Sequence, residues 1–364
     1  MDISGKKYTS KGFLTVFSIS AVTLLFIIGL TCYVVDPFLQ FRVDPKSRYI
    51  LNPRFVNGGL AKNYEYNTAL IGSSMVQSFD ISTLRNTYQG MKPVKLSSGG
   101  MNLAEMELLY SIVQEKGVKN IIMNVDMPFF NQAGFVSRYP GYLYEDGFMN
   151  KLQYLYSYEA QIQYIPANLG LELYFKIKDG NLPDVYKMKT NIDQIGTESY
   201  AKTYSAEFVK NYYLAGNSVL YQHVEHMEER MDNSLTSFIA KLEIDKHKDV
   251  DYTFMFPSYS ALYWYHTRKH DYYSQFLGFA AKFIRMVEKY DNVRVVSFLD
   301  RNEITDLNYY GDVTHFSPAL GDTIMTNMFN PKYEINSSNV DAMTQRVDSL
   351  VDAFIEKNKD WLPK

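Results

Sequence analysis

Two serines at the end of a short apolar run stand where a nucleophile could act. Residues 68–71 are mostly apolar, the run stops at Gly72, and Ser73 and Ser74 precede a segment, 75–79, that can begin a helix. The pattern predicts a strand, a tight turn and a helix. In a parallel sheet, groups at the carboxyl ends of strands face the ligand crevice, where a serine also lies beside unpaired backbone N–H groups. The alternative is an ordinary helix N-cap serine after a glycine turn.

A partner base for such a serine is His315, which follows Asp312 by three residues. A turn of that length can bring the carboxylate to the imidazole Nδ1. The carboxylate then orients the ring and leaves Nε2 as the base, as in a catalytic triad. The alternative is a capped turn with an ion pair. Ser317 and Pro318 fit the N-cap and the first position of a helix that begins after the turn.

The remaining histidines and the single cysteine predict no metal centre. His223 with His226, and His266 with His270, could each share a helix face, but neither pair brings an obvious third ligand or matches H-E-x-x-H. Cys32 is the single cysteine and lies inside the most apolar stretch. With one cysteine the chain has no internal disulfide and no cysteine-ligated metal site. We therefore expect neither a metal nor an organic cofactor.

Strand patterns and helix patterns alternate along the part of the chain that must position Ser74 and His315. Strand-like runs cover residues 68–71, 93–98, 120–126, 250–256 and 292–299, and helical patterns cover 102–116, 271–290 and one or two segments within 207–244. Asn102 and Glu105 match the two ends of a capping box. The alternation predicts an α/β fold with a parallel sheet, in which the segments that follow successive strands open on one edge.

The amino-terminal segment has the length and composition of a membrane anchor. Residues 13–35 contain no charged side chain, and about 20 such residues span a bilayer core of roughly 30 Å. We expect a cytoplasmic tail over 1–11 and an uncleaved transmembrane helix over 12–35, because the run lacks a signal-peptide exit. Basic residues flank both ends of the run, so charge does not decide the orientation. A short tail before a large domain favours a domain outside the membrane, and an intracellular domain is the alternative.

The rest of the chain divides into a connector and one domain. Residues 36–65 are rich in proline, glycine and aromatic side chains, which predicts an irregular, membrane-proximal connector. Residues 66–364 form the α/β domain, and the alternation of strands and helices lapses over about 129–205. We expect an insertion there, at the mouth of the sheet, with loops that shape the substrate site.

Composition excludes one large class of function. The chain has 364 residues, 46% of them hydrophobic, and a formal net charge of -3. The hydrophobic content is that of a packed globular protein, and no run rich in lysine and arginine is present. Binding to nucleic acid needs basic patches that attract the phosphate backbone, so we exclude it.

With these motifs in place, the sequence resembles the SGNH (GDSL-like) hydrolase superfamily. More narrowly, it resembles the membrane-anchored, extracytoplasmic branch with a Gly-[Ser/Thr]-Ser block, which includes proteins akin to the D-alanyl-lipoteichoic acid transfer protein and the alginate O-acetylation proteins. The resemblance covers roughly residues 49–328 and rests on three short blocks. They are Gly72-Ser73-Ser74, Ser98-Gly99-Gly100 and the D-x-x-H block of Asp312 and His315. It implies a three-layer, flavodoxin-like α/β domain with Ser74 as nucleophile, His315 as general base and Asp312 as orienting acid. It also implies that the backbone N–H groups of Ser74 and Gly100 form the oxyanion hole.

The sequence departs from this family at one position. The archetype has an asparagine after the third strand, which donates its side-chain amide to the oxyanion. Here Asn124 and Asp126 occupy that neighbourhood, and an ionised Asp126 would oppose a developing negative charge. The third oxyanion donor is therefore left open by the sequence.

The resemblance and the anchor lead to one principal hypothesis. The chain is expected to be a membrane-tethered serine acyl-ester hydrolase or acyltransferase that acts on a cell-envelope polysaccharide or glycolipid, with a small acyl group such as acetyl. A transferase would need an acyl donor from across the membrane, and hence a multi-span acyltransferase as a partner. The alternative is a non-catalytic envelope protein of the same fold that binds glycan or scaffolds a biosynthetic complex.

Overall fold

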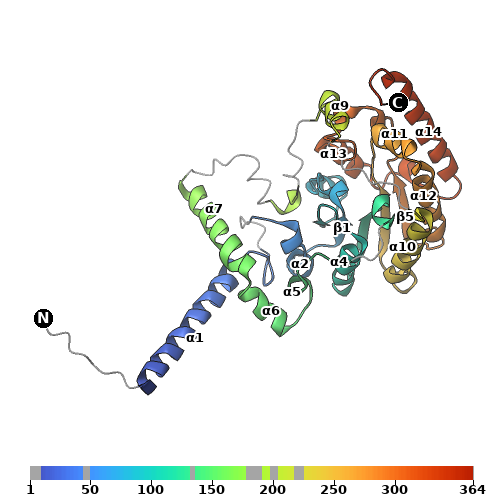
Figure 1. Ribbon diagram of the computed structural model, residues 1–364. Coiled ribbons are helices and arrows are strands. Elements are labelled where there is room, and N and C mark those ends of the chain that lie inside the picture. The colour runs from blue at the N-terminus through green and yellow to red at the C-terminus, as the bar shows by residue number, and fades with distance from the viewer. Residues whose placement is uncertain are drawn as a thin grey trace.

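A five-stranded parallel sheet forms the centre of the α/β domain (Figure 1). The computed structural model describes residues 10–43, 50–131, 136–177, 191–196, 204–216 and 225–363. The strands lie in the order β2-β1-β3-β4-β5 and run parallel throughout. Their bounds are β1 Thr68–Gly72, β2 Pro93–Ser97, β3 Asn120–Asn124, β4 Asp251–Phe256 and β5 Val293–Ser297. The five predicted strands and their parallel arrangement are confirmed.

Helices cover both faces of this sheet (Figure 1). Every residue of β1 and β2 is buried, which requires packing on both sides, as parallel sheets generally show. The helices that follow the first strands are α3 Ser82–Thr87 and α4 Leu103–Glu115. Further along the chain lie α9 Ala206–Leu214, α10 Met227–Leu242, α11 Ala261–Lys269, α12 Tyr273–Val287, α13 Pro318–Thr326 and α14 Val340–Asn358.

Two local signals of helix start are confirmed. The Asn102 side chain accepts a hydrogen bond from the Glu105 backbone N–H, and the Glu105 carboxylate accepts one from the Asn102 N–H, so the capping box closes in both directions. Ser317 caps α13 through the Leu320 N–H, and Pro318 occupies the first helical turn. In both cases the residues that fix the helix lie within four positions of one another.

Two predictions about local structure were wrong. The helix expected from Met75 is only a single 3-10 turn, η1 Ser74–Val76, because the chain has to turn again at Asp80 to enter α3. The connector contains a regular helix, α2 Pro53–Asn63, capped by the Asn52 side chain. A Cβ on Gly59 would clash with the carbonyl oxygens of Phe38 and Leu39, so this glycine permits the start of the connector to pack closely on α2.

The described part of the insertion is largely helical. It contains α5 Gly141–Tyr144, α6 Phe148–Leu155, the π-helix η3 Glu159–Tyr164, α7 Ile165–Ile177 and the 3-10 turn η4 Ile192–Gln194. Its middle extends to the amino-terminal helix rather than over the sheet (Figure 1). Its two ends return toward the end of β1 and β2, where Arg138 contacts Gly100 and Gly196 contacts Gln77. Only these ends match the predicted position at the mouth of the sheet.

The amino-terminal helix α1 Ser10–Val35 projects away from the domain (Figure 1). Among the described residues it is the one helix long and apolar enough to span a membrane. Most of its side chains are exposed, and its buried residues are Gly29 and Cys32. The predicted span of 12–35 agrees with these bounds, and most of the predicted tail, 1–11, lies outside the described residues.

Candidate active site

The structure brings together the three residues that the sequence suggested for acyl chemistry. The Ser74 Oγ lies 2.9 Å from His315 Nε2, and His315 Nδ1 lies 2.8 Å from Asp312 Oδ2. With the proton of the neutral imidazole on Nδ1, the ring donates to the carboxylate and accepts from the serine hydroxyl. This is the hydrogen-bond chain of a serine nucleophile, its base and an orienting acid.

Burial distinguishes the two adjacent serines. Ser73 is completely buried, whereas Ser74 is partly exposed at the start of η1. The Ser73 Oγ accepts from the Met75 N–H at 3.3 Å and donates to the Asp126 Oδ2 at 2.6 Å. A Cβ on Gly72 would lie 2.7 Å from the Asn124 Oδ1, which explains why a glycine precedes the serines. Ser73 therefore holds the turn, and Ser74 is the hydroxyl that a substrate can reach.

A short hairpin holds His315 opposite this turn. Tyr310 and Phe316 form an antiparallel bridge, and the Gly311 N–H donates to the His315 carbonyl at 2.9 Å. The Phe316 ring packs 5.9 Å from the ring of Phe79, which follows η1. Apolar packing near Ser74 and His315 thus supports the contact between two segments 241 positions apart.

Contacts between α3 and α13 support the same juxtaposition. The Thr83 hydroxyl donates to the Asp322 carboxylate at 2.9 Å, and the Tyr88 hydroxyl donates to the Thr326 carbonyl at 2.7 Å. α3 follows the serine turn and α13 follows the histidine hairpin. The pair of helices therefore acts as a second support behind the site.

The surroundings of Asp312 favour its ionised form. Burial acts to raise the pKa of this carboxyl, but hydrogen bonds from the His315 ring and from the backbone N–H groups of Thr314 and His315 outweigh it, and the pKa lies below its ordinary value. A folded-state pKa below the unfolded one contributes stability above the unfolded pKa, and this contribution is lost as the pH falls through the folded value. Asp312 is therefore a carboxylate under neutral and mildly acidic conditions.

The loop after β2 lies beside the serine turn. Gly72 pairs with Ser97 in the sheet, and the Ser98 N–H donates to the Gly72 carbonyl at 3.3 Å. The predicted oxyanion donors, the N–H groups of Ser74 and Gly100, therefore both follow adjacent strand ends. Neither N–H donates to a group in the described part of the chain.

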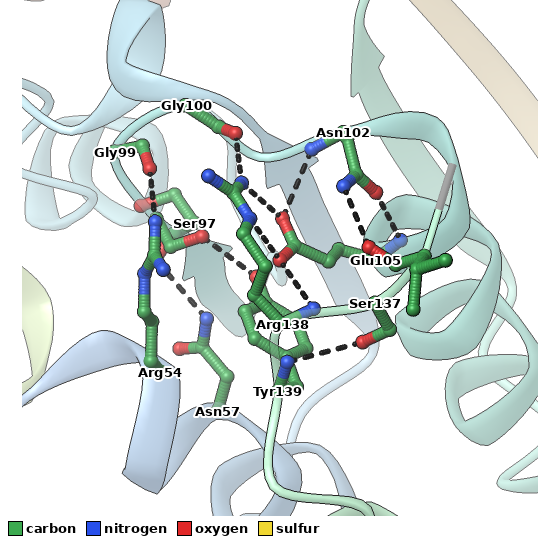
Figure 2. A network of polar contacts seen from close by, with 12 residues as sticks. Arg54, Asn57, Ser97, Gly99, Gly100, Asn102, Glu105, Ser137, Arg138 and Tyr139 are labelled. Carbon is green, nitrogen blue, oxygen red and sulfur yellow. Dashed lines mark hydrogen bonds and ion pairs between the residues drawn. The ribbon is translucent and has the colours of Figure 1, made fainter. Parts of the chain in front are cut away.

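Two arginines hold the backbone of this loop (Figure 2). The Arg54 Nη2 donates to the Gly99 carbonyl at 2.9 Å. Arg138 donates to the Gly100 carbonyl and forms an ion pair with the fully buried carboxylate of Glu105 at 2.8 Å. In a trans peptide the C=O and the following N–H point in opposite directions, so the bond from Arg54 fixes and polarises the peptide that carries the Gly100 N–H.

Asp126, which the sequence suggested as a neighbour of the oxyanion, is hydrogen-bonded to two hydroxyl groups. Its carboxyl is buried and accepts hydrogen bonds from the Ser73 and Tyr259 hydroxyls. Burial raises the pKa of Asp126, although these hydrogen bonds and the nearby His315 act to lower it. The raised pKa disfavours the ionised form of Asp126, which lessens the expected opposition to the oxyanion. Asn124 lies at the end of β3 and accepts from the Ser73 N–H at 2.8 Å through Oδ1.

The Asp126→Asn variant is expected to gain stability relative to the natural protein as the pH rises. A folded-state pKa above the unfolded one contributes stability below the unfolded pKa, and this is lost as the pH rises through the folded value. Asparagine keeps the shape and one acceptor oxygen, its NH₂ can donate to one of the two hydroxyls, and it has no such proton to lose. Urea unfolding of the full chain in detergent, followed by tryptophan fluorescence, measures the difference at several pH values. Asp245→Asn, at an exposed position, controls for loss of a surface charge, and a pH-independent difference at Asp126 would contradict the expectation.

Three residues that support the site were not anticipated from the sequence. Lys95, in the middle of β2, is completely buried and donates to the Gln77 and Phe79 carbonyls below η1. Tyr259 and Arg54 act through Asp126 and Gly99, as described above. A lysine within a predicted apolar strand was a signal that could have identified Lys95. Nothing in the local sequence pattern marked Tyr259 or Arg54.

No metal centre is formed by the residues that the structure describes. Within these ranges, no three His, Cys, Asp or Glu side chains are placed to share an ion. The rings of His266 and His270 lie 4.2 Å apart at the end of α11, and burial together with His270 lowers the pKa of His266 to about 4. His226 lies on the surface, and His223 lies outside the described residues.

Comparison with known proteins assigns neither a family nor a function to the chain. No protein-family model, no curated protein and no solved structure matches the chain. The functional argument therefore depends on the geometry of Ser74, His315 and Asp312 and on the sequence blocks that contain them.

Proposed function

We propose that the chain is a serine acyl-ester hydrolase or O-acyltransferase with an SGNH-like domain, tethered to the cell membrane by α1. One observation carries this proposal: the Ser74 Oγ lies 2.9 Å from His315 Nε2 while Asp312 engages the other ring nitrogen at 2.8 Å. The substrate is an ester of a small acyl group, such as acetyl, on a cell-envelope polysaccharide or glycolipid. The short tail before α1 and the large domain after it favour a domain on the outer side of the membrane, and the flanking charges do not decide the orientation.

The proposed reaction proceeds through an acyl-enzyme. The Ser74 Oγ forms a bond to the ester carbonyl carbon while His315 Nε2 takes the hydroxyl proton. The N–H groups of Ser74 and Gly100 donate to the resulting oxyanion. When the tetrahedral intermediate collapses, the bond to the leaving alkoxide breaks and His315 returns the proton to that oxygen.

The second half of the reaction decides between hydrolase and transferase. A water molecule or an acceptor hydroxyl gives its proton to His315 and attacks the acyl carbon, after which the Ser74 oxygen leaves and is reprotonated. Water yields the free acid, and a sugar hydroxyl yields a new ester. A transferase would receive its acyl group from a donor across the membrane, which gives a multi-span membrane acyltransferase a role as partner.

Covalent labelling tests the proposal. The full chain in detergent is treated with a fluorophosphonate probe and, separately, with p-nitrophenyl acetate. We expect turnover of the ester and a label that peptide mapping places on Ser74. The Ser74→Ala variant retains Ser73 as an adjacent serine, so a label that persists in this variant would show that Ser74 is not the nucleophile. Absence of both turnover and label in the folded natural protein would count against an enzyme.

The same variant separates the proposal from a non-catalytic envelope protein. A protein that only binds glycan or scaffolds a complex would keep its cellular phenotype after Ser74→Ala, because the loss of one partly exposed hydroxyl leaves the fold intact. An acyl-ester enzyme would lose the phenotype while the folded protein remains in the membrane. Protease accessibility on intact cells decides the side of the membrane on which the domain lies.

The Arg54→Ala variant is expected to lower kcat about tenfold, with a smaller change in KM. The reason is that Arg54 fixes the peptide whose N–H is aimed at the oxyanion, and one hydrogen bond to a charged group is worth ~1.5 kcal/mol or more. Arg54→Lys should restore part of the loss. Arg85→Ala, which removes an arginine paired with Asp193, serves as the matched control. An equal loss in both variants would show that general destabilisation, and not the Gly99 contact, is the cause.

A further inference from the structure

The insertion exposes large apolar side chains on two helices, α6 and α7, of which α6 lies beside α1. On α6 the exposed side chains include Phe148, Met149 and Leu152, which lie on one side of the helix. On α7 the exposed apolar side chains include Leu169, Leu173 and Ile177, each four residues from the next and therefore also on one side. The charged residues Glu172 and Lys176 are exposed along one edge of this row. Single exposed apolar residues are ordinary, but a patch that extends over two helices requires something to cover it.

The apolar side of α7 faces away from the domain. The Asn168 side chain accepts a hydrogen bond from the Ile50 N–H at 2.7 Å, and the buried Leu171 packs against Ile50. Residues two positions apart on an α-helix point about 200° away from each other. Because Leu171 is docked on the connector, Leu169 and Leu173 on either side of it point outward, and they are 53% and 59% exposed. The described part of the domain therefore leaves this side uncovered.

The contacts of α6 and η3 with α1 show how far along α1 the insertion reaches. The Tyr156 hydroxyl donates to the Leu25 carbonyl at 3.1 Å, and the Gln161 Nε2 donates to the Ile28 carbonyl at 3.1 Å. Leu25 precedes Val35, the last residue of α1, by ten residues, or about 15 Å along the axis. That distance is about half of a hydrocarbon core roughly 30 Å thick. The segment from Tyr156 to Gln161 thus meets α1 at positions that a membrane-spanning helix keeps among acyl chains.

We propose that α6, η3 and α7 form a platform embedded in the lipid leaflet next to the domain, with their exposed apolar sides among the acyl chains. The inference rests on the proposed membrane anchorage through α1 and is independent of the chemistry of Ser74. The hydroxyl of Tyr156 and the amide of Gln161 are already bonded to α1, so these groups do not enter lipid unsatisfied. Continuity with the lipid-facing surface of α1 favours a bilayer over a protein partner as the occupant.

This platform fixes the orientation of the domain relative to the membrane. The carboxylate of Asp36, the first residue after α1, accepts hydrogen bonds from the N–H groups of Gln40, Phe41 and Arg42 and from the Tyr154 hydroxyl of α6. The junction between helix and domain is thus tied to the insertion rather than left as a free linker. Apolar area buried in lipid is what amphipathic helices use to bind a membrane.

Depth-dependent quenching of a fluorescent label tests this proposal on the full chain. In a Cys32→Ala background, single cysteines replace Leu169 or Leu173 on the platform, Leu24 on the exposed side of α1, or Ser349 on the exposed side of α14. Each variant is labelled with bimane and reconstituted into phosphatidylcholine vesicles with or without brominated acyl chains. Aqueous iodide is the complementary quencher.

We expect the labels at Leu169 and Leu173 to lose as much fluorescence to brominated lipid as the label at Leu24, and the label at Ser349 to be quenched by iodide alone. Iodide quenching at Leu169 and Leu173 while Leu24 remains quenched by lipid would overturn the platform but leave the anchor intact. Protection of these two labels from both quenchers would also overturn it, by showing that protein covers the surface. Absence of lipid quenching at Leu24 would remove the anchorage on which the inference rests.

Discussion

Replacing Ser74 by alanine is expected to lower kcat/KM for an ester substrate by a factor on the order of 10⁴–10⁶, which is the range seen when the nucleophile of a triad is removed. The loss is large because the hydroxyl provides the covalent step, and no other described hydroxyl takes its place: the neighbouring Ser73 is buried and bonded to Asp126. Steady-state hydrolysis of p-nitrophenyl acetate by the full chain measures the ratio. Circular dichroism establishes that the variant is folded.

A double variant that combines Ser74→Ala with His315→Ala tests whether the two residues act together. His315→Ala should cost about as much as Ser74→Ala, and the two together should cost no more than either alone, because the base has no function once its hydroxyl is gone. Two residues that contribute independently would instead show losses that multiply. His270→Ala, which removes an exposed histidine at the end of α11, is the matched control and should retain full activity. Multiplying losses at Ser74 and His315 would contradict the proposed triad.

The parts of the fold that could be predicted from the sequence depend on short-range patterns. The strand at Thr68–Gly72, the capping box of Asn102 and Glu105, and the Ser317 cap are each determined by residues within a few positions. α2 was missed because its proline and two glycines indicate a break in the chain. The helix forms because the proline occupies its first turn, while Gly59 allows Phe38 and Gly58 allows Leu143 to pack closely against it. Long-range packing here overrides the local pattern.

In the candidate site, too, short motifs could be predicted from the sequence and long-range contacts could not. Ser74, Asp312 and His315 could be proposed because each lies in a short motif with a defined chemical purpose. The supporting contacts could not be, because they join residues from different elements: Asp126 meets Tyr259 across 133 positions, and Arg54 meets Gly99 across 45. Side-chain reach and burial decide such pairs, and neither is a property of a sequence window.

Asp312→Asn is expected to lower kcat by about 10⁴, although it changes one atom of a residue that does not touch the substrate. The Asp312 Oδ1 accepts from the Thr314 and His315 backbone N–H groups, and an asparagine oxygen can keep both bonds. Its amide NH₂ would then face His315 Nδ1 in place of the carboxylate oxygen. Since that amide donates, Nδ1 must accept, and the imidazole proton moves to Nε2. The ring can then no longer take the proton of Ser74.

This reasoning predicts which measurements change and which do not. KM should remain close to that of the natural protein, because the turn is retained, while kcat and the rate of fluorophosphonate labelling at Ser74 fall together. Thermal stability should fall only by the contribution that the ionised Asp312 carboxylate makes. Asp306→Asn is a matched control, since Asp306 caps the preceding turn through the Asn308 N–H at 3.0 Å in the same manner but faces no imidazole. Equal losses in the two variants would trace the effect to turn geometry. A loss confined to Asp312 would trace it to the tautomer of His315, and with it to a proton that moves between the imidazole and Ser74.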